Sequence, residues 1–213
     1  MNDHVSDPSL SRRSLLASGT GLVGGAVLWA SGLTPSAHAA VTEPGVWNSG
    51  RSANGWPVLG GTMRARSVPT HTIEGSDASV ALLSGDAAVV LLHAARRFHY
   101  EVEELDPDDV VGHTTSRKVA ASYESNYLSG TALAIQPDQF PVGAGDGLFP
   151  AQVATVREIL NDCEGVLRWG GDERMPKQGH FQIEVGPGDG RLRKVADKLR
   201  RWNEAPCRGA GTD

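Results

Sequence analysis

The stretch Ser125-Asn126-Tyr127-Leu128-Ser129-Gly130-Thr131-Ala132-Leu133-Ala134-Ile135 decides the fold of this 213-residue chain. Its second half, Thr131–Ile135, is a short apolar run with a β-branched residue at each end, which predicts a strand. This strand is the reference point from which the segments on either side are assigned.

The segments around this strand alternate between helical and extended patterns. Upstream, alternating apolar residues predict a strand pair within 71–83, and a helix of about fifteen residues follows Ser84-Gly85-Asp86. Downstream, the pattern predicts a helix at 150–163 that opens at Pro150, strands at 166–169 and 180–185, and a closing amphipathic helix at 190–203. The expected class is α+β, a single domain with an antiparallel sheet flanked by helices.

The first 39 residues read as an export signal. Ser11-Arg12-Arg13-Ser14-Leu15-Leu16 is a twin-arginine signature, a glycine-rich apolar run follows, and Ala37-His38-Ala39 supplies the small residues of a cleavage site. An uncleaved anchor helix is the alternative, which the Gly and Ser of the run disfavour. We therefore expect a secreted, cell-wall-associated protein without a permanent membrane span.

The rest of the chain divides by composition into an extended N-terminal arm (40–70), a domain (71–203) and a C-terminal tail (204–213). In the arm, Trp47 and Trp56 are expected to anchor it to the domain, with a sugar-stacking platform as the alternative. The net charge of −5 gives no reason to expect nucleic acid as a partner. We expect a monomer.

Cys163 and Cys207 are the two cysteines of the chain. In an oxidising compartment such a pair favours one disulfide, and two unpaired residues are the alternative.

The order of these segments resembles the zinc D-alanyl-D-alanine carboxypeptidase and dipeptidase family, whose fold is shared with the hedgehog signalling domain. Its zinc motif is S-x-H-x-x-G-x-A-x-D. Ser125, Gly130 and Ala132 stand in register with that motif, whereas Tyr127 occupies the His position and Ala134 the Asp position. The resemblance implies a hedgehog/DD-peptidase-like fold.

The resemblance also assigns roles to single residues. His180 matches the last-strand zinc ligand and is left as a remnant of the metal site, while Lys177 falls on the position of the general base. Arg117 matches the carboxylate-binding arginine, so Arg117, Ser125 and Tyr127 are the candidate substrate-binding residues. A catalytic zinc needs three protein ligands and an open position. We therefore expect no catalytic residue and no cofactor.

Other ionisable residues are alternatives for a rearranged site. His93 and His99 lack the spacing of a zinc pair and are expected at the surface or at its boundary. Asp172 or Glu173 is a possible replacement base, and His113 a possible replacement ligand.

The sequence therefore predicts a non-catalytic envelope module that binds peptidoglycan stem peptide or an envelope protein. An active zinc peptidase that uses a rearranged site is the alternative, and a domain that only stabilises an envelope complex is a third hypothesis.

Overall fold

A four-stranded antiparallel sheet forms the centre of the domain in the computed structural model, which describes residues 45–205. Its strand order is β4, β6, β8, β7, and the strands span Val110–Val111, Ala132–Ile135, His180–Ile183 and Leu167–Trp169. The predicted strands at 131–135, 166–169 and 180–185 are confirmed to within two residues at their ends. The predicted signal peptide and Cys207 lie outside the described residues.

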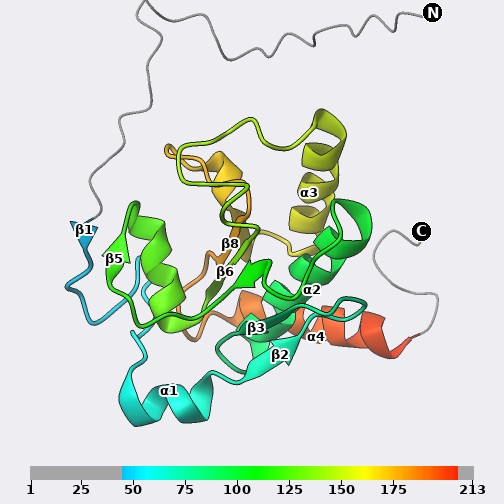
Figure 1. The fold of residues 1–213 in the computed structure, drawn as a ribbon. Coiled ribbons are helices and arrows are strands. Elements are labelled where there is room, and N and C mark those ends of the chain that lie inside the picture. The colour runs from blue at the N-terminus through cyan, green and yellow to red at the C-terminus, as the bar shows by residue number, and fades with distance from the viewer. Residues whose placement is uncertain (1–44, 206–213) are drawn as a thin grey trace, which may run out of the picture. The chain divides into compact units, whose positions relative to one another are not determined.

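Three long helices accompany this sheet: α2 (Asp86–Glu101), α3 (Pro150–Asp162) and α4 (Gly190–Glu204). Helices α2 and α3 contact its strands, and α4 packs on α2. Helix α2 contacts β6 and β8 as well as both other helices, and Figure 1 shows all three to the right of β6 and β8. Apolar residues at helical spacing on α2, among them Leu91 and Phe98, are fully buried. The α+β class is confirmed. Between residues 45 and 205, no helix combines the length and apolar character that a membrane crossing needs.

Two small sheets lie outside the central one. Strands β2 (Thr70–Thr72) and β3 (Ser79–Ala81) form the predicted antiparallel pair, and β1 (Gly45–Val46) pairs with β5 (Lys118–Val119). The start of the arm is therefore attached to the domain by strand pairing between β1 and β5.

The arm is not extended throughout, and this part of the prediction was wrong. Residues Gly61–Ser67 form helix α1, which contains Met, Arg and Ala, all good helix formers. None of its residues is buried. The periodicity that reveals a packed helix is thus missing from its sequence.

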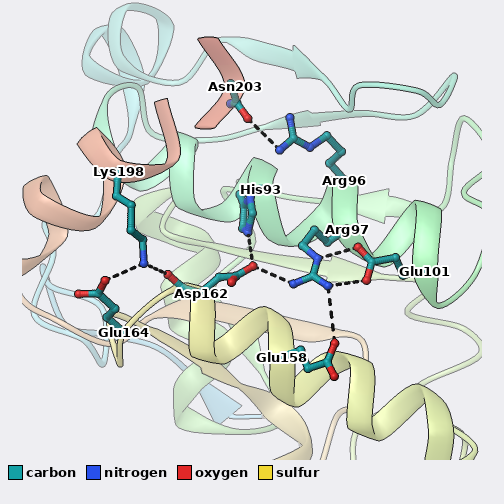
Figure 2. A network of polar contacts seen from close by, with 9 residues as sticks. All are labelled: His93, Arg96, Arg97, Glu101, Glu158, Asp162, Glu164, Lys198 and Asn203. Carbon is teal, nitrogen blue, oxygen red and sulfur yellow. Dashed lines mark hydrogen bonds and ion pairs between the residues drawn. The ribbon is translucent and has the colours of Figure 1, made fainter. Parts of the chain in front are cut away.

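A polar network joins α2, α3 and α4 (Figure 2). His93 Nε2 lies 3.1 Å from Asp162 Oδ2, and Arg97 Nη1 donates to the same oxygen at 2.7 Å. Arg97 also binds Glu101, and Lys198 Nζ donates to the backbone carbonyl of Asp162. The network supplies partners for charged groups that the helix contacts remove from water.

The prediction that His93 lies at the surface or at its boundary was wrong, because only 4% of the residue is exposed, whereas His99 is half-buried as expected. Burial lowers the pKa of His93 despite the opposing effect of the Asp162 carboxylate. Its polar partner comes from another helix, 69 residues away in the chain, which a local pattern does not reveal.

The Ser125–Ile135 stretch enters the core as a 3-10 helix followed by a strand. Helix η1 (Ser122–Ser129) is followed by its C-cap residue Gly130, whose φ is 67°. A Cβ at Gly130 would lie 2.8 Å from the backbone nitrogen of Leu83, so both the left-handed conformation and the close approach require glycine. This turn brings η1 back against β6, so that Tyr127 shares a small buried cluster with Ala132 and Ala134.

Candidate functional site

Two neighbouring segments of the chain and a distant one meet at the positions where the resemblance expects a metal. Ala134 on β6 is the register partner of His180 on β8. The hydroxyl oxygen of Tyr127 lies 2.6 Å from His180 Nδ1, and the planes of the two rings are nearly perpendicular. The structure thus brings together the two substituted positions and the remaining histidine.

His180 has hydrogen-bond partners for both ring nitrogens. Its Nε2 lies 2.9 Å from Gln182 Oε1, and that oxygen also accepts a hydrogen bond from Asn126 Nδ2 at 2.7 Å. Tyr127 donates to Nδ1 when the imidazole is neutral and carries its proton on Nε2. This assignment satisfies the hydroxyl, the imidazole and the side-chain oxygen of Gln182 together.

Burial fixes the protonation of both partners. The pKa of Tyr127 is raised well above its ordinary value, first by burial and then by the nearby Glu124 carboxylate. The pKa of His180 is lowered to about 4, chiefly by burial, against the hydrogen bond to Gln182 that raises it. Near pH 7 the site therefore contains a phenol and a neutral imidazole.

A buried ion pair lies next to this cluster. Lys177 Nζ donates to Glu124 Oε1 at 2.7 Å, and the two side chains are 9% and 13% exposed. Burial alone would raise the pKa of Glu124, but the charge and hydrogen bond of Lys177 lower it overall. The ammonium also lies 5.2 Å from the centre of the Tyr127 ring, within range of a cation–π contact. Lys177 is therefore a charge partner rather than a proton acceptor.

These residues do not fit a zinc ion. Ala134 has no donor atom, Tyr127 keeps its proton, and both nitrogens of His180 have partners. Among residues 45–205, no group of three or more His, Cys, Asp or Glu side chains is arranged to hold a metal. The cluster is also closed, since Tyr127 is 7% and His180 0% exposed.

The other candidate substrate-binding residues hold the arm. Ser125 Oγ accepts a hydrogen bond from the backbone nitrogen of Ala53 at 2.8 Å and donates to the Ser122 carbonyl. Arg117 Nη1 donates to the carbonyls of Trp47 and Ser49. In the described structure both residues thus contact the arm.

The residues considered for a rearranged site have other partners. Asp172 forms an ion pair with Arg157, and Glu173 one with Arg168. His113 Nε2 lies 3.3 Å from the carbonyl oxygen of Leu59.

The predicted disulfide stays a prediction, because Cys207 lies outside the described residues. Cys163 is fully buried in the main core. Burial raises the pKa of its thiol to about 12.

Sequence reasoning missed Glu124, Asn126 and Gln182, which complete the cluster. Gln182 follows His180 by two residues on one strand, so their side chains share a face. Asn126 lies within the motif, and Glu124 immediately precedes it. The alternation of the strand was a usable signal for Gln182, whereas the pairing of Glu124 with Lys177 joins segments 53 residues apart.

Comparison of the chain with protein-family models, with curated proteins and with solved structures gives no match in any of the three. The family resemblance therefore stays a prediction that depends on the residues quoted above.

The lowered pKa of His180 predicts that the protein loses stability in mild acid. Its pKa is about 4 in the folded state and 6.5 when unperturbed, so between these values the unfolded chain binds the proton more tightly. The free energy of unfolding should fall by roughly 3 kcal/mol as the pH drops through this window, and this group adds no further loss below it. Guanidinium unfolding at several pH values measures the change.

The lowered pKa of His93 acts in the same direction, so NMR titration of each imidazole is needed to separate the two. A His180 ring that titrates near its ordinary pKa of 6.5 would contradict this account.

Proposed function

We propose that this chain is an exported, non-catalytic module of the cell envelope with a D-alanyl-D-alanine peptidase-like fold. In this proposal, a closed polar cluster has replaced the metal centre of the family. The twin-arginine signature and the ordered segments of the sequence support the location and the ancestry. The contacts around His180 support the loss of chemistry.

The single observation that carries the proposal is the hydrogen bond between Tyr127 and His180. This hydrogen bond occupies Nδ1 of His180, and the buried ring of Tyr127 fills the adjacent space. A hydrolase needs an activated water beside a base, and here Lys177 occupies the base position as the partner of Glu124.

The closed cluster also bears on how the module binds. A stem peptide that entered at the former metal position would have to displace Tyr127 from a buried contact. We therefore propose that peptidoglycan, or an envelope protein, binds at a surface away from His180.

The second candidate is an active zinc peptidase that uses a rearranged site. It requires that Asp172 or Glu173 break its ion pair with Arg157 or Arg168, respectively. The hydrogen bond between Tyr127 and His180 would also have to break. These contacts disfavour it, so the non-catalytic module is the better proposal.

Metal content and wall binding test the proposal together. The mature protein, purified without a chelating tag, is expected to contain far less than stoichiometric zinc and to release no D-alanine from a stem pentapeptide. It should nevertheless sediment with purified cell walls. Elemental analysis, an amino-acid release assay and a sedimentation assay provide the three measurements.

Two outcomes would argue against it. Stoichiometric zinc, together with hydrolysis that chelation and His180→Ala both abolish, would establish the peptidase. Retention on neither cell walls nor muropeptides would remove the evidence for a wall-binding role.

A further inference from the structure

A cavity of about 310 Å³ opens on the side of the domain where α2 and α4 both begin. Its lining comes from the arm, from the start of α2 and from the loop and first turn of α4, and includes Trp56, Ser84, Asp86, Asp189, Leu192 and Arg193. This volume is at the lower end of the range of about 300–1,000 Å³ for small-molecule sites. None of these residues belongs to the His180 cluster.

Trp56 forms an ordered wall of this cavity. Its indole Nε1 donates to the carbonyl of Val185 at 2.8 Å, and the side chain packs against the main core. Because its N–H is already used, Trp56 offers the cavity only the carbon surface of its ring.

The carboxylates of the lining are each paired with an arginine. Asp86 Oδ1 accepts a hydrogen bond from Arg200 Nη2 at 2.7 Å, and Asp189 pairs with Arg191 at the same distance. Among the described residues, Asp86 Oδ2 has no hydrogen-bond partner and can accept one from a ligand. The carboxylates therefore act as oriented acceptors whose charge is already balanced.

Two further polar groups have no partner within residues 45–205: the guanidinium of Arg193 and the hydroxyl of Ser84, both on exposed residues. The start of α2 also lacks a side-chain cap, since its N-cap residue is Gly85. The cavity thus combines free donors, a free acceptor and an aromatic surface.

From this combination we propose that the cavity is a saccharide-binding site. A sugar ring has a C–H face that packs on an indole and a rim of hydroxyls that both donate and accept hydrogen bonds. Asp86 would accept from such hydroxyls, while Ser84 and Arg193 would donate to them. Because Asp86 and Asp189 are each paired with an arginine, the lining offers a cation no unbalanced negative charge and sets Arg193 against it. A polyhydroxyl ligand uses the free acceptor of Asp86 as well as the donors of Ser84 and Arg193.

The proposed function supplies the source of the sugar, and the inference depends on it in that respect alone. The glycan of a bacterial wall is built of N-acetylated amino sugars. A soluble oligomer of N-acetylglucosamine is therefore the probe, and a maltooligosaccharide is the comparison for neutral glucans.

Isothermal titration calorimetry on the full mature chain tests the site. The N-acetylglucosamine oligomer is expected to bind, and Trp56→Ala should weaken binding roughly tenfold or more by removing the packed surface. Arg193→Ala should weaken it severalfold while leaving the fold intact, since Arg193 is exposed and has no partner among residues 45–205. Trp47→Ala is the matched control and should bind as the unmodified chain does.

Absence of binding to both oligosaccharides at millimolar concentration would overturn the inference, as would binding that Trp56→Ala and Arg193→Ala leave unchanged. If Trp56→Ala fails to fold, Arg193→Ala and the NMR shifts of Gly188 and Gly190 decide the question. Wall retention without sugar binding would refute this site and leave the proposed function standing. If the protein binds the sugar and is also a zinc-dependent hydrolase, the site is supported and the proposed non-catalytic function is refuted.

Discussion

Replacing Tyr127 with His and Ala134 with Asp in one variant should create a zinc site, the largest change expected of any substitution in this chain. The register of β6 and β8 sets position 134 opposite His180, and the Tyr127 side chain already reaches His180. The change restores two ligands and frees a nitrogen of the third. Zinc bound by three protein ligands is held orders of magnitude more tightly than by one imidazole.

The metal-free variant should be less stable than the unmodified chain, because it buries a new carboxylate at a position only 2% exposed. Zinc should then raise its melting temperature by mass action. Calorimetric titration and thermal unfolding with and without zinc measure both effects. Peptidase activity is not expected, since Lys177 still occupies the base position.

The two single variants serve as controls, and each should bind zinc much more weakly than the double variant. If the double variant takes up no zinc at saturating metal, the register between this chain and the peptidase motif is wrong.

Breaking the buried pair of Lys177 and Glu124 should cause the largest loss of stability. Lys177→Met leaves a buried carboxylate without its ammonium partner, which typically costs about 3–5 kcal/mol. Glu124→Gln leaves the opposite charge unpaired and should also be strongly destabilising. The double variant should recover most of the loss, because replacing both charges removes the unpaired one.

Guanidinium unfolding at neutral pH gives the four free energies of this cycle. Lys194→Ala is the matched control: its partner is Glu164, the two side chains are 77% and 41% exposed, and its loss should cost less than about 1 kcal/mol. Single variants of the buried pair that lose no more than this control would show that water screens Lys177 and Glu124 as well.

Helices α2, α3 and α4 and the strands β6, β7 and β8 were predictable because each carries its own local pattern, whereas β4, with only two residues, was not predicted. In α2 and α4, residues such as Leu91 and Leu199 recur at helical spacing and are fully buried. Helix α1 was missed for the complementary reason, since none of its residues is buried. The periodicity of apolar residues reveals a helix only where one face of that helix is buried, so it does not reveal an exposed helix such as α1.

The candidate site was predictable only in outline. The motif indicated that Tyr127, Ala134 and His180 belong together, and their contacts agree with that grouping. The ion partner of Lys177 and the burial of His93 depend on pairings between distant segments, for which a single sequence gives no signal. From the sequence, Trp47 and Trp56 likewise had the same expected role, and only the structure shows that Trp56 lines a cavity.

The hydrogen bonds of the arm set an order of events during synthesis. The backbone nitrogen of Ala53 donates to Ser125, which is synthesised 72 residues later. The side chains of Asn54 and Trp56 donate to the carbonyls of Ile183 and Val185, each synthesised 129 residues later. Within the described residues, the segment that is synthesised first thus completes its hydrogen bonds last, because some of its partners do not exist until β8 and Val185 are made. A fully docked arm therefore marks a chain that extends at least through Val185, and a chain that ends before β8 lacks the partners of Asn54 Nδ2 at Ile183 and of Trp56 at Val185.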